Sequence, residues 1–92
     1  MVTVKFYTLL RLQLNTHELA LDLPGGTVAD VLAAAQGAIA TPFLAKLLDE
    51  ERALRSGTII LVNGLNILHA QKLATPVRDG DVVALFPPGG GG

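Results

Sequence analysis

The sequence contains no cysteine, and this single absence excludes several chemistries. A chain without thiols cannot form disulfides, hold an iron–sulfur cluster through thiolates, build a zinc ribbon or use a cysteine nucleophile. Any covalent chemistry in which the chain takes part must therefore use another group.

Charged residues of either sign are also scarce. Seven basic and eight acidic residues are scattered along the chain, and the net charge is −1. Proteins that bind nucleic acid or an anionic lipid surface concentrate positive charge on one face. The sequence therefore predicts that neither nucleic acid nor a membrane is a partner.

Long hydrophobic runs are missing as well. No stretch approaches the roughly 18 apolar residues that a membrane-spanning helix needs, and the start of the chain lacks the pattern of a signal peptide. We therefore expect a cytoplasmic protein. Its 92 residues suffice for one domain, and because half of them are hydrophobic, we expect part of the apolar surface to meet a partner protein.

The first part of the chain shows the period-two pattern of half-buried strands. Apolar residues occupy every second position over residues 2–6 and again over residues 19–23. These two segments are predicted to pair as an antiparallel hairpin. Residues 9–15 between them are apolar but contain Arg11, Gln13 and Asn15, and are predicted to form a longer turn with some buried leucines.

Two helices are predicted in the middle of the chain. Residues 24–26 break the second strand, and Thr27 with Asp30 resembles a capping box ahead of apolar residues at helical spacing. This helix should run to about residue 37. Thr41-Pro42 predicts the start of a second, short helix with the proline at its first position, and Phe43, Leu44, Leu47 and Leu48 would form its apolar face.

The last part of the chain predicts a hairpin and a central strand. Residues 58–62 are β-branched and apolar, Asn63-Gly64 is a strong hairpin signal, and residues 65–68 would form a short return strand. Residues 82–86 are almost wholly apolar, as in a central strand, and stop at Pro87-Pro88, which cannot donate to a ladder. This order of elements favours an α+β fold with helices packed on one face of a sheet.

Few side chains suggest a metal or catalytic site. Asp79 and Asp81 flank a glycine ahead of the last strand, a pattern more typical of a turn than of a cation site. His17 and His69 are isolated from other ligand residues, so we predict no metal site and no bound cofactor.

Four consecutive glycines, residues 89–92, end the sequence. Glycine has no side chain, so such a tail can lie extended in a channel too narrow for other residues. At 3.3 to 3.6 Å per residue it would reach roughly 13 Å beyond the stiff Pro87-Pro88 pair. A tail of this composition is also typical of a flexible linker, and that alternative stays open on composition alone.

The end of the chain resembles that of the MoaD/ThiS family of sulfur carriers. The family commonly finishes with an Asp-Gly-Asp turn, a strand, Phe-Pro-Pro, two variable residues and Gly-Gly, and here residues 78–92 read RDGDVVALFPPGGGG. Phe6-Tyr7, Thr27-Val28 and Val62-Asn63-Gly64 extend the resemblance over essentially the whole chain. It implies a β-grasp, ubiquitin-like roll over residues 1–88, with the last strand parallel to the first in the middle of the sheet and a flexible glycine tail at 89–92.

The resemblance also implies the chemistry. The carboxylate of Gly92 would be adenylated by a partner enzyme that uses ATP and then converted to a thiocarboxylate, so the chain would need no catalytic side chains of its own. The length and the Phe-Pro-Pro sequence are similar to the small subunit of molybdopterin synthase. The implied partners are a MoeB-like adenylyltransferase, a sulfur donor and a MoaE-like large subunit of the synthase. Gly89 and Gly90 replace residues that usually carry side chains, and Leu12 stands where many relatives have an acidic residue.

The alternation also predicts a partner-binding surface. Tyr7 and Phe86 should lie side by side on the sheet face away from the helix, where aromatic side chains could anchor a partner together with Leu65. Pro87, Pro88 and Gly89, Gly90 and Gly91 would then direct the tail. The alternative for the aromatic pair is burial under a loop or helix.

Three alternative functions share these features. One is a sulfur carrier for tungsten cofactor, thiamine thiazole or tRNA thiolation, and a second is a ubiquitin-like modifier joined to lysines. A third, of a different class, is a β-grasp nucleic-acid module, which would need a basic face that the sequence does not show.

Overall fold

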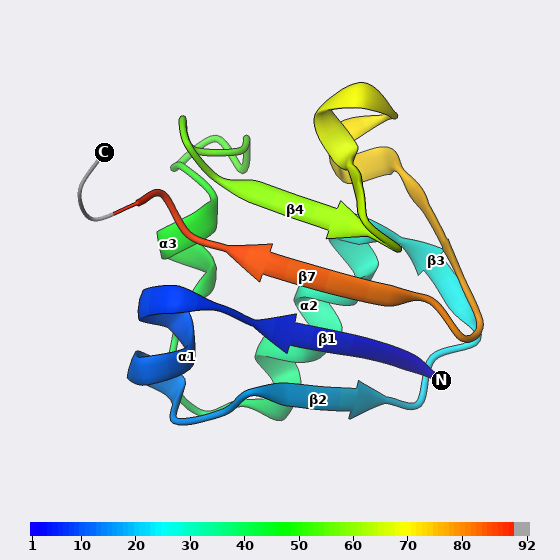
Figure 1. Cartoon of the computed structure of the whole chain (residues 1–92), viewed down its shortest axis with the longest axis horizontal. Coiled ribbons are helices and arrows are strands. Elements are labelled where there is room, and N and C mark those ends of the chain that lie inside the picture. Colours follow the sequence, from blue (N-terminus) through cyan, green and yellow to red (C-terminus); the bar gives the residue numbers. More distant parts are fainter. Residues whose placement is uncertain (90–92) are drawn as a thin grey trace.

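The computed structural model describes residues 1–89 (Figure 1). The main sheet has the strand order β2-β1-β7-β4-β5, and a second, two-stranded sheet pairs β3 with β6. The strands are β1 (Val2–Phe6), β2 (Glu18–Leu21), β3 (Gly25–Thr27), β4 (Ile59–Val62), β5 (Leu65–Asn66), β6 (Pro76–Arg78) and β7 (Val82–Phe86). The helices are α1 (Thr8–Leu14), α2 (Val28–Ala38) and α3 (Leu44–Leu47), with short 3₁₀ turns at η1 (Ile67–His69) and η2 (Lys72–Ala74).

The centre of the main sheet is the pair β1 and β7. They run parallel, whereas β1 pairs with β2 and β7 pairs with β4 in antiparallel register, so the expected β-grasp order is confirmed. Val2, Val4 and Phe6 are completely buried on the face that α2 covers (Figure 1). Burial of each such large apolar side chain stabilises the fold by roughly 1.5 to 3 kcal/mol.

The start of α2 is the predicted capping box. The Thr27 side chain accepts a hydrogen bond from the Asp30 backbone N–H at 3.2 Å, and the Asp30 carboxylate accepts one from the Thr27 N–H at 2.9 Å. Two backbone donors that the helix itself leaves unpaired are thus satisfied. The helix ends at Ala38, close to the predicted limit.

The prediction of a long turn over residues 9–15 is wrong, because α1 occupies Thr8–Leu14. Leu10 and Leu14, four residues apart on one face, are buried and anchor the helix to the core. Asn15 adopts the left-handed conformation with φ of 50°, and its N–H bonds back to the last turn. The polar residues among the leucines therefore mark the solvent side of a helix.

The second predicted helix is shorter than expected and begins later. Pro42 lies outside α3, and Phe43 occupies the N-cap position. The Gln36 side chain provides the link, because its amide oxygen accepts hydrogen bonds from the N–H groups of Phe43 at 2.9 Å and Leu44 at 3.2 Å. Its amide nitrogen donates to the carbonyls of Ile39 and Thr41. One side chain on α2 thus fixes the whole connection to α3.

The predicted hairpin at Asn63-Gly64 is confirmed. Val62 pairs directly with Leu65, and Asn63 and Gly64 have φ of 49° and 85°, as a two-residue hairpin turn with two left-handed positions requires. The return strand is shorter than predicted, because the Asn66 side chain accepts a hydrogen bond from the Leu68 N–H and starts η1.

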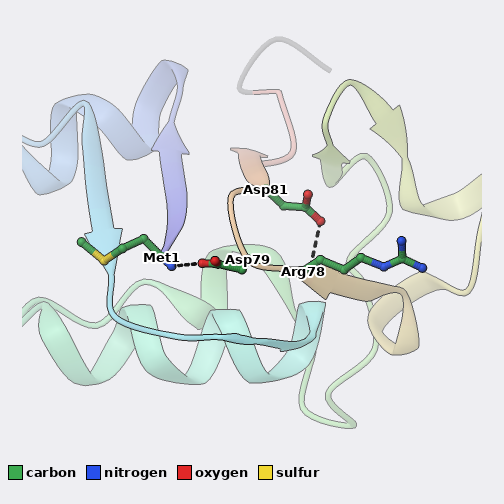
Figure 2. Close-up of polar contacts among 4 residues, drawn as sticks. All are labelled: Met1, Arg78, Asp79 and Asp81. Atoms are coloured by element: carbon green, nitrogen blue, oxygen red, sulfur yellow. Dashed lines mark hydrogen bonds and ion pairs between the residues drawn. The ribbon is translucent and has the colours of Figure 1, made fainter.

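The turn before β7 is held by its own carboxylates (Figure 2). Asp81 accepts a hydrogen bond from the Arg78 backbone N–H at 2.8 Å. It accepts a second from the Asn63 side chain at 2.9 Å, and these two bonds lower the pKa of its carboxyl below the ordinary value. Asp79 forms an ion pair with the α-amino group of Met1. Both aspartates therefore have the structural role that the sequence predicts.

The helices of residues 1–89 include none with the length and apolar character needed to cross a membrane.

Candidate functional site

The C-terminal segment leaves the domain at the centre of the sheet. Phe86 ends β7 between β1 and β4, Pro87 and Pro88 are half-buried, and Gly89 is exposed. Gly57, with φ of 89°, lies beside Pro88, since a Cβ at Gly57 would be 3.5 Å from the proline Cβ. The expected sulfur-bearing residue Gly92, together with Gly90 and Gly91, lies outside the described residues. The described part of the site is thus the exit from which the tail continues.

Two aromatic rings stack at this exit. The rings of Tyr7 and Phe86 have centroids 4.4 Å apart and an interplanar angle of 9°. The Tyr7 backbone N–H donates to the Leu85 carbonyl at 3.1 Å, which extends the pairing of β1 and β7 by one residue. The two side chains therefore lie side by side, as the alternation predicts. Both are half-buried, so each keeps some exposed surface.

Arg11 on α1 adds a cation to the stack. Its guanidinium carbon lies 5.0 Å from the centroid of the Tyr7 ring, and its Nε donates to the Phe6 carbonyl at 3.1 Å. A cation over an aromatic face is attracted by the ring quadrupole. Sequence reasoning missed this role because it did not place residues 9–15 on a helix.

Ile59 on β4 completes an apolar surface. It pairs directly with Phe86 across the β4–β7 ladder, so the two side chains lie on the same face of the sheet, and Ile59 is 42% exposed. We call Tyr7, Ile59 and Phe86 the aromatic patch. Residues 59–62 are all apolar, so the sequence predicts a strand but not the face on which Ile59 lies. Its neighbour could be named only once the register between β4 and β7 was known.

Leu65 lies apart from the aromatic patch. It pairs with Val62, which packs against the core on the opposite face of the sheet, and Val62 in turn pairs with Val83, near the start of β7. Leu65 is 56% exposed at the edge of the sheet. The structure thus brings Tyr7 and Phe86 together but does not bring Leu65 to them.

A groove of about 770 Å³ lies next to the exit. It lies between α1, α3 and the C-terminal segment, and its lining includes Leu9, Leu12, Ala45, Lys46, Arg55, Pro87 and Pro88. Leu9 and Leu12 are 55% and 76% exposed, which makes them two of the most exposed large apolar side chains among residues 1–89. This groove has no counterpart in the sequence-based predictions, because it depends on α1.

The groups around the exit are mostly apolar. The exit is surrounded by aromatic, aliphatic and proline groups, which are common in the cores of protein interfaces. Within residues 1–89 no group of three His, Asp or Glu side chains is close enough to hold a metal ion. The arrangement can present a backbone segment beside an exposed apolar face.

Known proteins are similar to this chain in fold and in sequence. The small archaeal modifier protein 3 of Haloferax volcanii is 36% identical over 66 residues, which cover 72% of this chain and 70% of that protein. The crystal structure of SAMP1 from Haloferax volcanii superposes with a TM-score of 0.82 at 26% identity, covering 99% of this chain and 98% of that one. The solution structure of SAMP1 from Methanosarcina acetivorans gives 0.75 at 33% identity, covering 99% and 95%.

The family model described as the ThiS family matches residues 4–92, nearly the whole sequence. Its match includes the exit, the stacked aromatic residues and the glycine tail. With the β-grasp topology and the structural neighbours, this shows that the chain belongs to the ThiS family of small ubiquitin-like sulfur carriers and modifiers.

Proposed function

We propose that the chain carries sulfur as a thiocarboxylate on Gly92 and donates it in molybdopterin biosynthesis, as the small subunit of molybdopterin synthase. The observation that supports this most is the position of the exit. β7 delivers the chain from the middle of the sheet through half-buried Pro87 and Pro88 to exposed Gly89, directly beside the aromatic patch. A partner that binds the patch would have the tail within reach of its own active site.

The chemistry needs no catalytic side chain from this chain. The Gly92 carboxylate attacks the α-phosphate of ATP on a MoeB-like adenylyltransferase, which releases pyrophosphate and leaves a mixed anhydride with AMP. The terminal sulfur of a persulfide on the donor then attacks the acyl carbon and displaces AMP, which gives an acyl disulfide. A thiol attacks the donor's own sulfur, forms a disulfide with it and releases the terminal thiocarboxylate. A thiocarboxylate is ionised at neutral pH, so its sulfur is a nucleophile without a neighbouring base.

The proposal assigns roles to the described residues. Tyr7 and Phe86, and separately Leu65, would contact partner enzymes, and Pro87 and Pro88 would aim the tail toward the MoaE-like large subunit. The Phe-Pro-Pro sequence and the chain length support the molybdopterin branch, whereas the fold is common to the other sulfur pathways.

The test is the mass of the C-terminal peptide after the chain is incubated with ATP, the adenylating enzyme and a sulfur donor from native cells. Replacement of oxygen by sulfur adds about 16 Da, and oxidation of Met1, the single methionine, adds nearly the same mass. The gain must therefore be found by fragmentation in the tryptic peptide that follows Arg78. Adding the sulfurated chain to the MoaE-like subunit should then yield molybdopterin from its precursor.

Deletion of Gly91 and Gly92 is the matched control. It should abolish the mass gain while the amide spectrum of residues 1–88 stays that of the folded domain. A chain whose C-terminal carboxylate is converted to an amide should not support sulfur transfer in the pathway. If it supported sulfur transfer as well as the unblocked chain does, the proposal would be overturned.

A second function, that of a protein modifier joined to lysines, is favoured by one observation. The relative that is 36% identical is named a modifier protein. The same activated Gly92 would then form an isopeptide bond instead of receiving sulfur. A chain tagged at its N-terminus should in that case give a ladder of larger bands in native cells, and the deletion of Gly91 and Gly92 should remove the ladder.

A further inference from the structure

The groove beside the exit presents an apolar helix face that the domain leaves uncovered. Leu9 and Leu12 are three residues apart on α1, so they lie on the same side of the helix, whereas Leu10 and Leu14 face the core. Leu9 and Leu12 are 55% and 76% exposed, whereas the other two leucines of α1 are buried. Exposed apolar side chains that lie next to each other are typical of a surface that binds another molecule. This face is suited to contact with another molecule.

The groove also carries positive charge from two of its lining side chains. Among residues 1–89, the charged side chains in its lining are those of Lys46 and Arg55, and none of the lining side chains is acidic. The Nε of Arg55 donates to the Ala45 carbonyl at 2.7 Å, which fixes the guanidinium beside α3. An occupant with carboxylates at its border would be attracted to this rim.

The position of the groove indicates which molecule fills it. Pro87 and Pro88 form one wall, and the tail continues directly from Pro88. Because the remaining glycines span roughly 13 Å at most, a protein that holds Gly92 in its active site must bring its entrance close to this wall. The groove and the tail would therefore face the same partner. Activation of Gly92 is the step that both functions proposed above require, so we take the adenylating enzyme as this partner.

We propose that the groove binds an apolar segment flanked by carboxylates at the entrance of the enzyme that adenylates the tail. This contact is separate from the aromatic patch and rests on the proposed function, since it requires that Gly92 be activated by another protein. It assigns to α1 and α3 a recognition role that neither the fold nor the tail requires.

The experiment uses the adenylating enzyme purified from native cells and measures ATP–pyrophosphate exchange as a function of the concentration of the chain. Leu12→Ser should raise the KM for the chain about tenfold with kcat unchanged, because one leucine side chain loses its burial. Lys46→Glu should raise KM by about fivefold at low salt, and this difference should shrink at high salt.

Two residues of the same types serve as matched controls. Leu68, which is 51% exposed on η1, and Lys72, which is exposed on η2, lie outside the groove. Leu68→Ser and Lys72→Glu should leave KM within twofold of the wild-type value. Leu12 and Lys46 are both exposed, so the Leu12→Ser and Lys46→Glu variants are expected to fold. The amide NMR spectrum of each variant checks that it does.

The outcomes separate the two proposals. If exchange requires Gly91 and Gly92 but KM is the same for the wild type, Leu12→Ser and Lys46→Glu, the groove proposal is overturned and the proposed function stands. If the deletion of Gly91 and Gly92 supports exchange as well as the full chain does, or if the full chain supports none, both are overturned.

Discussion

The ring of Tyr7 lies parallel to the ring of Phe86, 4.4 Å away, although the two residues come from opposite ends of the sequence. The parallel register of β1 and β7 explains this contact. Phe6 pairs with Leu85 on the buried face, so the next residue of each strand, Tyr7 and Phe86, meets its neighbour on the open face. The contact therefore joins the first strand to the exit of the tail.

This stack should contribute measurably to stability. In a double-mutant cycle of Tyr7→Ala and Phe86→Ala, we expect a coupling energy of about 1 kcal/mol, because stacked aromatic pairs add that much beyond their burial. Urea unfolding of the two single variants and the double variant measures it. A parallel cycle of Tyr7→Ala with Leu65→Ala should give no coupling, since the register places Leu65 on the other face of the sheet. Equal coupling in both cycles would contradict this arrangement.

Asp81 accepts hydrogen bonds from Arg78 and Asn63, and we call these two bonds the clasp. The clasp should make the stability of the fold decrease at acid pH. The pKa of Asp81 is lowered in the folded state, chiefly by the hydrogen bond from the Arg78 N–H and then by that from Asn63. Its contribution is therefore complete above the ordinary aspartate pKa of about 4 and is lost as the pH falls through the lower, folded-state value. Urea unfolding of the wild type and Asp81→Asn between about pH 2 and pH 6 should show a smaller acid loss in the variant.

Asn63→Ala provides the intermediate case for this clasp. It removes one of the two hydrogen bonds to Asp81 and also the acceptor for the Val82 N–H. Its acid-dependent loss should lie between those of the wild type and Asp81→Asn. An Asp81→Asn variant with the same pH profile as the wild type would show that the clasp has no energetic role.

Two glycines should respond oppositely to alanine. Gly25 in β3 has φ of 142°, and a Cβ there would lie 2.6 Å from the carbonyl oxygen of Val77, so Gly25→Ala should destabilise the fold by about 2 kcal/mol or more. Gly37 lies inside α2 with nothing within 4 Å of an added Cβ, and Gly37→Ala should stabilise the fold by about 0.5 to 1 kcal/mol. The two midpoints of thermal unfolding measure the difference, and a Gly25→Ala midpoint equal to that of the wild type would refute the close approach of β3 and β6.

Sequence reasoning succeeded where the signal was local. Alternation identified β1 and β2, and the apolar run ahead of Pro87-Pro88 identified β7. The Thr27 and Asp30 pair identified the start of α2, and Asn63-Gly64 identified the hairpin. Each of these depends on residues within a few positions of one another. The topology came from resemblance to a family, because strand order depends on contacts between distant segments.

The remaining features depend on distant partners. The pairing of β3 with β6 joins Gly25 to Arg78, and Gln36 caps a helix that begins eight residues later. The helix α1 is only seven residues long, too short for its period to be separated from that of an apolar turn. In the candidate site, the aromatic pair followed from alternation, whereas Ile59, Arg11 and the groove required the register and the packing of α1.

The parallel pairing of β1 with β7 also places the N-terminus and the C-terminal segment at opposite ends of the sheet. Met1 precedes β1 at the end of the sheet where β7 begins, and Pro87 follows β7 at the other end, about five residues or 16 Å away. A dye, a resin or a fused reporter attached at Met1 would displace only a surface ion pair with Asp79, which is worth little in water. Molecules immobilised through Met1 would all present the opposite end of the sheet, where Pro87, Pro88 and Gly89 lie, toward the solution.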